Sequence, residues 1–202
     1  MLLRDEVVRP CRVTQIRTPA SHHGRLWVRP ARVDYWTAGA SLSKMQPEIH
    51  LLAGLNGAGK TTLARQLEAT LPAVRFSLDE WMLLLYDLSF DDELYPSRAD
   101  TCRAVIWDLA AQVVRTGSSV VLDWNMWSRS RRAEAVDRAA GLGVTCHLHH
   151  VVVSEETAIE RVTQRRDSRA HQLDADAVRH LARLFETPEE GEGFVLHSVT
   201  GR

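Results

Sequence analysis

The stretch Gly54-Leu55-Asn56-Gly57-Ala58-Gly59-Lys60-Thr61 decides the fold of this chain. It follows an apolar run at 49–53 and precedes a helical pattern over 61–70, in which Leu63 and Leu67 share one face. The stretch fits G-x-x-x-x-G-K-[S/T] between a strand and a helix, the context that indicates a phosphate-binding loop, or P-loop. Its glycines let successive N–H groups point at phosphate oxygens, and the helix N-terminus adds partial positive charge.

The loop supplies the predicted nucleotide-binding residues. We expect Lys60 to span the β- and γ-phosphates of ATP and the Thr61 hydroxyl to bind Mg²⁺. From Met45 onward, Lys60 is the only lysine among 17 basic residues. A compact, flexible ammonium fits such a loop where a fork-shaped guanidinium would not. The predicted ATP-binding residues here are Gly54, Asn56, Gly57, Ala58, Gly59, Lys60, Thr61 and Thr62.

Composition limits the class of protein. The chain has 202 residues, 45% hydrophobic and 25% charged, with a formal net charge of -1, which is typical of a soluble globular domain. No stretch of 18 apolar residues exists, and the first ten residues lack the apolar core of a secretory signal. The three cysteines lie far apart and form no Cys-x-x-Cys pair. We expect a cytoplasmic protein with no membrane partner.

The charge distribution divides the chain near Lys44. Residues 1–44 hold eight basic and three acidic side chains, so their net charge is +5, whereas residues 45–202 carry -6. The first segment shows no sustained period of 2 or 3.6 residues. We expect it to be a basic, disordered leader and 45–202 to be the folded domain. The alternative for the leader is a basic arm for an anionic partner.

From Met45 onward, short apolar runs alternate with helical patterns. Strands are predicted at 49–53, 73–78, 118–122, 144–153 and 194–199, and helices at 61–70, 97–116, 128–140, from 154 onward and at 174–185. Ser97, with Asp100 three residues later, resembles a capping box at the start of the long helix. Such alternation predicts a three-layer α/β fold, in which helices cover both faces of a parallel sheet. Ligands in such folds bind at the carboxyl ends of the strands.

Two carboxylates follow predicted strands. Asp123 ends the strand Val120-Val121-Leu122, where a Walker B carboxylate helps to hold Mg²⁺. The next residue is Trp124 rather than the glutamate that activates water in motor ATPases, which argues against an ATP-hydrolysing machine. Asp79 ends the second strand and could accept the proton of a hydroxyl that attacks the γ-phosphate. The alternative for Asp79 is a helix N-cap, and both roles could hold.

A group of arginines follows the fourth strand. In a helix that starts at Ser154, Arg161, Arg165 and Arg169 would share one face, with Arg166 beside them. Like charges at this spacing cost about 0.2 to 0.5 kcal/mol per pair, and none has an acidic residue three or four positions away. We therefore expect Arg161, Arg165 and Arg169 to bind ATP phosphate from a short lid. Arg161 and Arg165 would also stabilise charge during catalysis. The alternative is an ordinary solvated helix.

Together these features resemble the small P-loop kinases related to nucleoside monophosphate kinases, of the zeta-toxin and chloramphenicol-phosphotransferase-like group. The resemblance covers about 48–199. It rests on the loop at 54–61, Ser77-Leu78-Asp79-Glu80, Val120-Val121-Leu122-Asp123 with Trp127, Arg129 and Arg132 after it, the lid arginines and Phe185-Glu186-Thr187-Pro188. It implies a P-loop NTPase fold with a five-stranded parallel sheet in the order 2-3-1-4-5, use of ATP and Mg²⁺, and phosphoryl transfer to a hydroxyl.

The resemblance also implies roles for single residues. Asp79 takes the position of the catalytic base, and Arg129 or Arg132 falls where contacts with the acceptor or with phosphate occur. Family members differ in their acceptors, so the resemblance implies the type of reaction without the identity of the molecule that receives the phosphate.

Aromatic and acidic side chains bear on the acceptor. Trp81, Trp124 and Trp127 follow the carboxyl ends of two strands and could stack a sugar, a nucleobase or an aryl ring; the alternative is core packing. The predicted substrate-binding residues are Asp79, Trp81, Asp123, Trp124, Trp127, Arg129 and Arg132. An acidic insert with Asp87, Asp91, Asp92 and Glu93 disfavours a polyanionic acceptor and tolerates a neutral or cationic one.

The leading hypothesis is an ATP-dependent phosphotransferase that acts on the hydroxyl of a small molecule. One alternative is a polynucleotide 5′-hydroxyl kinase, which the charge of -6 on 45–202 disfavours. Another is a nucleotide-binding switch or toxin-like effector with a protein partner. The sequence leaves the oligomeric state open.

The predicted domain boundary can be tested by deletion. Removing residues 1–44 is expected to leave phosphotransferase activity unchanged, because the predicted catalytic residues all follow Met45. The measurement compares steady-state rates of the full and shortened chains. Loss of activity in a shortened chain that still folds would show that the basic leader takes part in function.

Overall fold

The computed structural model describes residues 46–88, 92–164 and 173–201. The predicted leader at 1–44 lies outside the described residues, as do Asp91 of the acidic insert and Arg165, Arg166 and Arg169 of the predicted lid. Within the described residues, no helix has the length and apolar character needed to cross a membrane.

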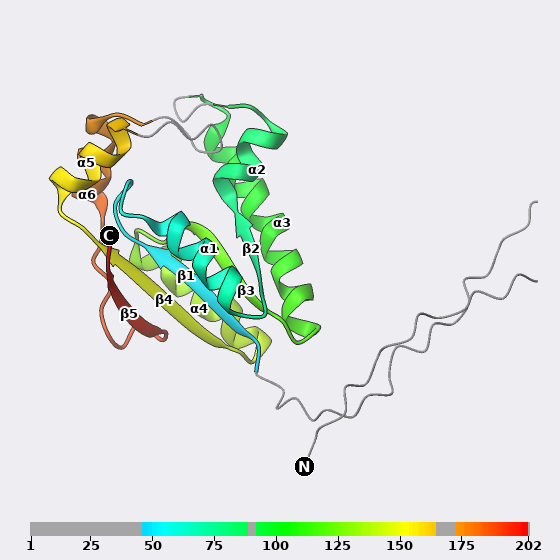
Figure 1. The fold of residues 1–202 in the computed structure, drawn as a ribbon. Helices are drawn as coiled ribbons and strands as arrows, with labels where there is room; N and C mark the ends of the chain where they lie inside the picture. The colour runs from blue at the N-terminus through cyan, green and yellow to red at the C-terminus, as the bar shows by residue number, and fades with distance from the viewer. Residues whose placement is uncertain (1–45, 89–91, 165–172, 202) are drawn as a thin grey trace, which may run out of the picture. The chain divides into compact units, whose positions relative to one another are not determined.

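A five-stranded parallel sheet forms the centre of the fold, in the order β2-β3-β1-β4-β5 (Figure 1). Its strands are β1 (Glu48–Ala53), β2 (Ala73–Ser77), β3 (Ser119–Asn125), β4 (Thr145–Val152) and β5 (Val195–Thr200). The predicted fold class and strand order are confirmed. Ser77 at the end of β2 pairs with Asp123 of β3, so two of the predicted site segments end at the same edge of the sheet.

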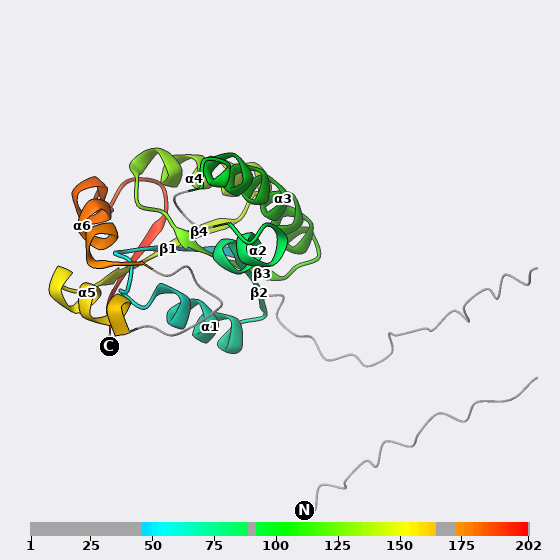
Figure 2. The ribbon, with the colours of Figure 1, turned by 90° about the horizontal axis from the view of Figure 1, so that it is seen from above.

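In the described part of the chain, six helices surround the sheet: α1 (Lys60–Thr70), α2 (Leu78–Leu85), α3 (Tyr95–Arg115), α4 (Arg129–Leu142), α5 (Glu155–Gln164) and α6 (Ala175–Leu184). Figure 2 shows α1 on one face of the sheet and α3 and α4 on the other. The larger core lies between the sheet and α3 and α4, where Ile49, Leu122 and Ile106 are fully buried. A smaller core, with Leu52, Ala64 and Val121, lies under α1.

The long helix α3 begins two residues earlier than the sequence predicts. It starts at Tyr95, with Pro96 in its first turn, and the Ser97 hydroxyl donates to the Leu94 carbonyl oxygen at 2.9 Å instead of capping the helix. Proline is favoured in the first turn because its missing N–H would have no helical partner there. The expected capping box at Ser97 is therefore wrong.

Four histidines form a row across the face of the sheet that carries α1. His50 of β1, His147 and His149 of β4 and His197 of β5 have neighbouring ring centroids 4.8 to 5.4 Å apart. Burial, together with the charges of neighbouring imidazoles, lowers the pKa of His50 to about 4 and that of His149 to about 3. His150 faces the other side of the sheet, where its ring stacks on Phe185.

This row predicts a loss of stability in acid. Because the folded protein holds His50 and His149 neutral below their usual pKa of 6.5, the unfolded chain binds more protons there. The free energy of unfolding should fall from about pH 6.5 towards pH 4, by up to about 1.4 kcal/mol per pH unit for each ring. Urea unfolding across this range measures it.

The variant His149→Gln should flatten this pH dependence, since it removes one of the two rings. The matched control is His180→Gln, because His180 is exposed on α6. An unchanged slope in His149→Gln would contradict the assignment.

Candidate active site

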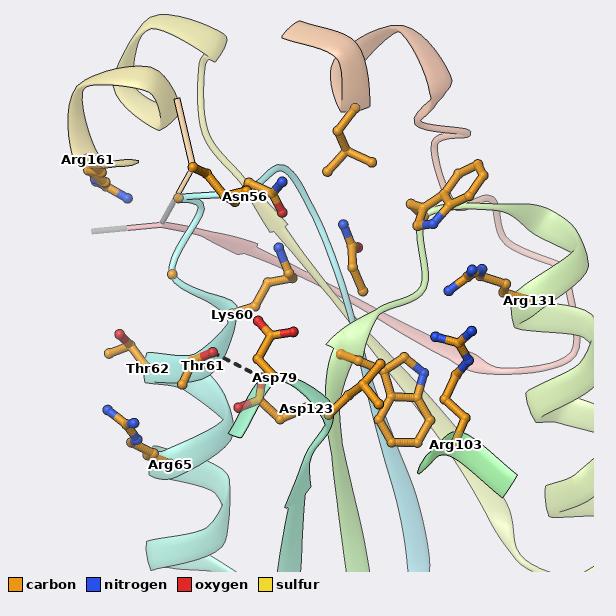
Figure 3. Close-up of a pocket in the computed structure, with 18 of the residues that line it drawn as sticks. Asn56, Lys60, Thr61, Thr62, Arg65, Asp79, Arg103, Asp123, Arg131 and Arg161 are labelled. Carbon is orange, nitrogen blue, oxygen red and sulfur yellow. Dashed lines mark hydrogen bonds between the residues drawn. The ribbon is translucent and has the colours of Figure 1, made fainter. Parts of the chain in front are cut away.

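A cavity of about 520 Å³ lies at the carboxyl ends of β1, β2 and β3 (Figure 3). Most of the predicted site residues within the described part of the chain line it together. They are Asn56, Gly57, Gly59, Lys60, Thr61, Thr62, Asp79, Asp123, Trp124, Trp127 and Arg161. Residues that are remote in sequence therefore line one cavity.

The loop between β1 and α1 depends on glycine. Gly54 has φ 144° and Gly57 has φ 85°, both in the left-handed region. A Cβ atom on Gly57 would lie 2.4 Å from the carbonyl oxygen of Ala158 in α5, and one on Gly54 would lie 2.5 Å from that of Val151. Side chains at these positions would push the loop away from α5 and β4, so the glycines set its position as well as its curvature.

Lys60 is the first residue of α1. Its Nζ atom donates to the carbonyl oxygens of Gly54 at 3.0 Å and Leu55 at 2.8 Å, so the ammonium lies across the loop. The amino end of α1 faces the same end of the cavity. A cation beside a helix N-terminus and a curled loop forms a site for a phosphate group.

Thr61 and Asp123 meet beside this loop. The Thr61 hydroxyl donates to Asp123 Oδ1 at 3.2 Å, which joins the first turn of α1 to the end of β3 (Figure 3). The Asp123 side chain is only 3% exposed. Burial raises the pKa of this carboxyl group, while the charge of Arg75 opposes that rise. A hydroxyl and a carboxylate oxygen are the ligand types that Mg²⁺ prefers.

Arg75, in β2, connects this carboxylate to α2. Its Nη1 donates to Asp123 Oδ2 at 2.8 Å, and its Nη2 donates to both carboxylate oxygens of Glu80 at 3.0 and 2.9 Å. Although burial raises it, the pKa of Glu80 is lowered overall by its hydrogen bonds from Arg75 and Arg65. Sequence reasoning missed Arg75. Its signal was a single arginine inside an otherwise apolar strand.

Asp79 lines the cavity from the first turn of α2. The cap of this helix is Ser77, whose side chain accepts from the Glu80 N–H at 3.5 Å, so the N-cap alternative for Asp79 is wrong. The strand ends one residue before the predicted end, and Leu78 already belongs to the helix. Tyr95 lines the same wall, and burial together with the charge of Asp79 raises its pKa.

Arg161 joins three segments beside the loop. Its guanidinium donates to the carbonyl oxygens of Ala58 and Gly201, each at 3.4 Å, and it also lines the cavity. Ala58 itself is buried and does not line the cavity. The other predicted lid arginines, Arg165 and Arg169, lie outside the described residues.

Three predicted substrate contacts lie away from this cavity. Trp81 packs edge-on against Phe76 with ring centroids 6.2 Å apart. Arg129 is exposed and pairs with Glu189 at 2.8 Å. Arg132 is fully buried, so its expected contact with the acceptor or with phosphate is wrong and its role is structural.

Arg132 holds the C-terminal segment against α4. It donates to both carboxylate oxygens of Glu192, at 2.7 and 2.9 Å, and to the carbonyl oxygens of Met126 and Glu186. Because successive helical residues point about 100° apart, Arg131 is the arginine of this turn that reaches the cavity. Trp124 has a double role, since it lines the cavity and packs edge-on against the buried Trp107.

Sequence reasoning missed several residues that line the cavity: Arg65, Leu78, Tyr95, Arg103, Asn125, Arg131, Leu173 and Leu181. Arg103 comes from the middle of α3, where no sequence pattern distinguishes it from other exposed helical arginines. Arg131 lies between Arg129 and Arg132 in the sequence, and the resemblance selected those two arginines instead. The described carboxylates of the acidic insert, on Asp87, Asp92 and Glu93, do not line the cavity.

Comparison with known proteins places the chain in a family. A family model described as an AAA domain matches residues 49–188. The chain belongs to the AAA-domain family. The match spans the AAA domain from β1 to the segment after α6, and thus includes every residue that lines the cavity. No curated protein matches this AAA domain.

Solved structures share the fold of this AAA domain. One is a putative kinase from Chloroflexus aurantiacus, with 21% identity, a TM-score of 0.59 and coverage of 77% of this chain and 89% of the other. Another is Kti12 from Chaetomium thermophilum in complex with ADP-AlF3, with 19% identity, a TM-score of 0.57 and coverage of 75% and 88%. A chain of the Pnkp1/Rnl/Hen1 RNA repair complex has 19% identity, a TM-score of 0.58 and coverage of 68% and 44%. These likenesses establish the P-loop fold.

The contact between Arg75 and Asp123 predicts that substitutions of these two residues have strongly non-additive effects on the free energy of unfolding. Arg75→Met should lower the free energy of unfolding by about 3 to 5 kcal/mol, because it leaves the buried Asp123 carboxylate without its cation. The double variant with Asp123→Asn should lose clearly less than the sum of the two single losses. Denaturant unfolding of the four proteins in the cycle measures this coupling.

The matched control is Arg179→Met, which removes an exposed pair with Asp176 and should cost less than about 1 kcal/mol. Additive losses from Arg75→Met and Asp123→Asn would show that the pair contributes no specific interaction.

Proposed function

We propose that this AAA domain is an ATP-dependent phosphotransferase that moves the γ-phosphate of ATP to a hydroxyl group of a small molecule. One observation carries the proposal: the Lys60 loop, the contact between Thr61 and Asp123, and the Asp79 carboxylate line a single cavity. The resemblance to the zeta-toxin and chloramphenicol-phosphotransferase-like group supports this reaction type. We also propose that 45–202 is the kinase domain, outside the 1–44 leader, and that the enzyme is cytoplasmic.

The residues present fit a magnesium nucleotide. The loop offers a glycine-lined concavity with an ammonium across it, as a triphosphate requires. Thr61 and Asp123 would hold Mg²⁺, and neutralisation of charge on the transferred phosphate is the chemistry that the ion would supply. Arg161, already beside the loop, would add a fixed positive charge. Arg165 and Arg169 are proposed to join it from the segment after α5.

Asp79 is proposed as the catalytic base. The acceptor hydroxyl oxygen forms a bond to the γ-phosphorus, and the bond from that phosphorus to the oxygen bridging the β- and γ-phosphates breaks. The electron pair of the broken bond leaves with ADP, and the hydroxyl proton passes to the Asp79 carboxylate. Asp79 suits this role because its carboxylate projects into the cavity (Figure 3).

The aromatic side chains give the acceptor an apolar surface. Trp124 and Trp127 line the cavity and come from the segment that follows Asp123. Stacking of a ring or of the apolar face of a sugar on indole would orient the hydroxyl group. Trp81 is not part of this surface, since it packs against Phe76.

An acceptor screen tests the proposal. Consumption of ATP with Mg²⁺ is measured with sugars, sugar acids, nucleosides, aminoglycosides and a 5′-hydroxyl oligonucleotide. We expect one class of small molecule to raise turnover far above the acceptor-free rate. With that acceptor, Asp79→Asn should lower kcat by about 10²- to 10⁴-fold, because the amide cannot accept the hydroxyl proton, while the protein still binds nucleotide.

Lys60→Met should instead weaken nucleotide binding measured by calorimetry. Asp108→Asn, an exposed carboxylate on α3, is the matched control for the Asp79 variant. A well-folded protein that takes up no magnesium nucleotide would overturn the proposed function. Full transfer by Asp79→Asn would remove Asp79 from the role of base.

A further inference from the structure

Two arginines enter the cavity on the side that faces away from the loop. Arg103 comes from α3 and Arg131 from α4, and Figure 3 shows their guanidinium groups beside each other, across the space from Thr61 and Thr62. The proposed roles of the nucleotide site and of Asp79 use neither arginine. Two cations in adjacent positions on one wall therefore need a separate explanation.

The surroundings of Arg131 make its charge costly. Burial lowers the pKa of its guanidinium and the neighbouring charge of Arg103 lowers it further, while the charges of Asp100 and Glu134 oppose this shift. Its carbon Cζ lies 5.3 Å from the centre of the Trp127 ring, which fixes the plane of the group. Among the residues that the structure describes, no carboxylate lies within ion-pair distance of Arg131. Arg103 pairs with Asp100, a largely exposed residue of its own helix.

An amide with open hydrogen-bonding capacity also lines the cavity. Asn125 follows Trp124 at the end of β3 and lines the cavity. Both polar atoms of its side chain, Oδ1 and Nδ2, are buried, and neither has a hydrogen-bond partner within the described ranges. Buried amides without partners are costly, so this group also points to a polar ligand.

We propose that Arg103 and Arg131 bind an anionic group of the acceptor, so that the molecule phosphorylated carries a carboxylate or a phosphate as well as its hydroxyl. This inference rests on the proposed phosphotransferase function and names the chemical class of its acceptor. Paired guanidiniums match the oxygen spacing of either anion, and an anion between them relieves their mutual repulsion. Asn125 then bonds a polar group of the acceptor.

The geometry leaves room for the body of such a molecule. A second hollow of about 270 Å³, which Asp100 and Glu134 also line, shares Arg103, Trp124 and Arg131 with the main cavity. The anion site therefore lies between the two spaces, with Asp79 on the side towards the loop. An acceptor held there by its anionic end presents its hydroxyl towards Asp79.

This inference revises the expectation of a neutral or cationic acceptor. That expectation rested on the acidic insert, but its described carboxylates do not line the cavity. The wall formed by Arg103 and Arg131 is positive, while the net charge of 45–202 is negative. The charges lining the site, and not the sum over the domain, select the ligand.

Anion binding to the protein loaded with a non-hydrolysable nucleotide tests the proposal. With Mg²⁺ and adenylyl imidodiphosphate filling the loop, calorimetry measures the binding of inorganic sulfate, D-gluconate and glycerol 3-phosphate, with D-glucose and glycerol as neutral partners. We expect the anions to bind and the neutral partners to bind far more weakly. Stronger binding of gluconate or of glycerol 3-phosphate distinguishes a carboxylate from a phosphate.

The variants Arg103→Gln and Arg131→Gln should weaken anion binding by about 10- to 100-fold and leave nucleotide affinity unchanged. Arg115→Gln, an exposed arginine at the end of α3, should change neither. If no anion binds to the loaded protein, or if the variants bind anions as well as the parent does, the proposal is overturned.

The test also separates failure of this proposal from failure of the proposed function. The same titration is run without nucleotide on Lys60→Met, whose loop has lost its ammonium. Anion binding that depends on Arg103 and Arg131 in that protein supports the anion site even if the parent takes up no nucleotide. Nucleotide uptake without such anion binding retains the phosphotransferase and rejects the acceptor class.

Discussion

The buried carboxylate of Asp123 is the constraint on which the site depends. It accepts a hydrogen bond from Thr61 in α1 and forms an ion pair with Arg75 in β2. Asp123 itself lies in β3, so these contacts join the helix after the loop to two strands. A buried carboxylate is stable only with such partners. The same arginine also binds Glu80 at the start of α2, which carries Asp79. The positions of the proposed metal-binding carboxylate and of the proposed base are thereby linked.

Around this centre, the two sides of the cavity differ in how their charge is built. On the loop side, backbone geometry forms the anion site, since the glycines and the amino end of α1 stand beside Lys60. On the opposite side, the long side chains of Arg103 and Arg131 extend from two helices. Asp79 carries negative charge between these positive regions. In the proposed reaction, such a layout would separate a triphosphate from an anionic acceptor and place a proton acceptor between them.

Much of this site could be predicted from sequence because its pieces are local. The loop at 54–61 is continuous, Asp79 follows β2, and Asp123 lies near the end of β3, at the same edge of the sheet. Trp81 and Arg129 failed as site residues because proximity along the chain does not specify the direction of a side chain. Arg132 shows the same limit. It is buried, whereas Arg131, the residue before it in α4, faces the cavity.

The sequence by itself determined the parallel α/β fold, the strand order through its family resemblance, and the nucleotide-binding loop, because strand-and-helix periodicity and the loop motif are short-range patterns. Only the tertiary structure decided which charges meet. The pairing of Arg75 with Asp123, the adjacency of Arg103 and Arg131, and the row of histidines across β1, β4 and β5 all join side chains from separate elements. Strand register and helix rotation set those distances, and no local pattern in the chain encodes either.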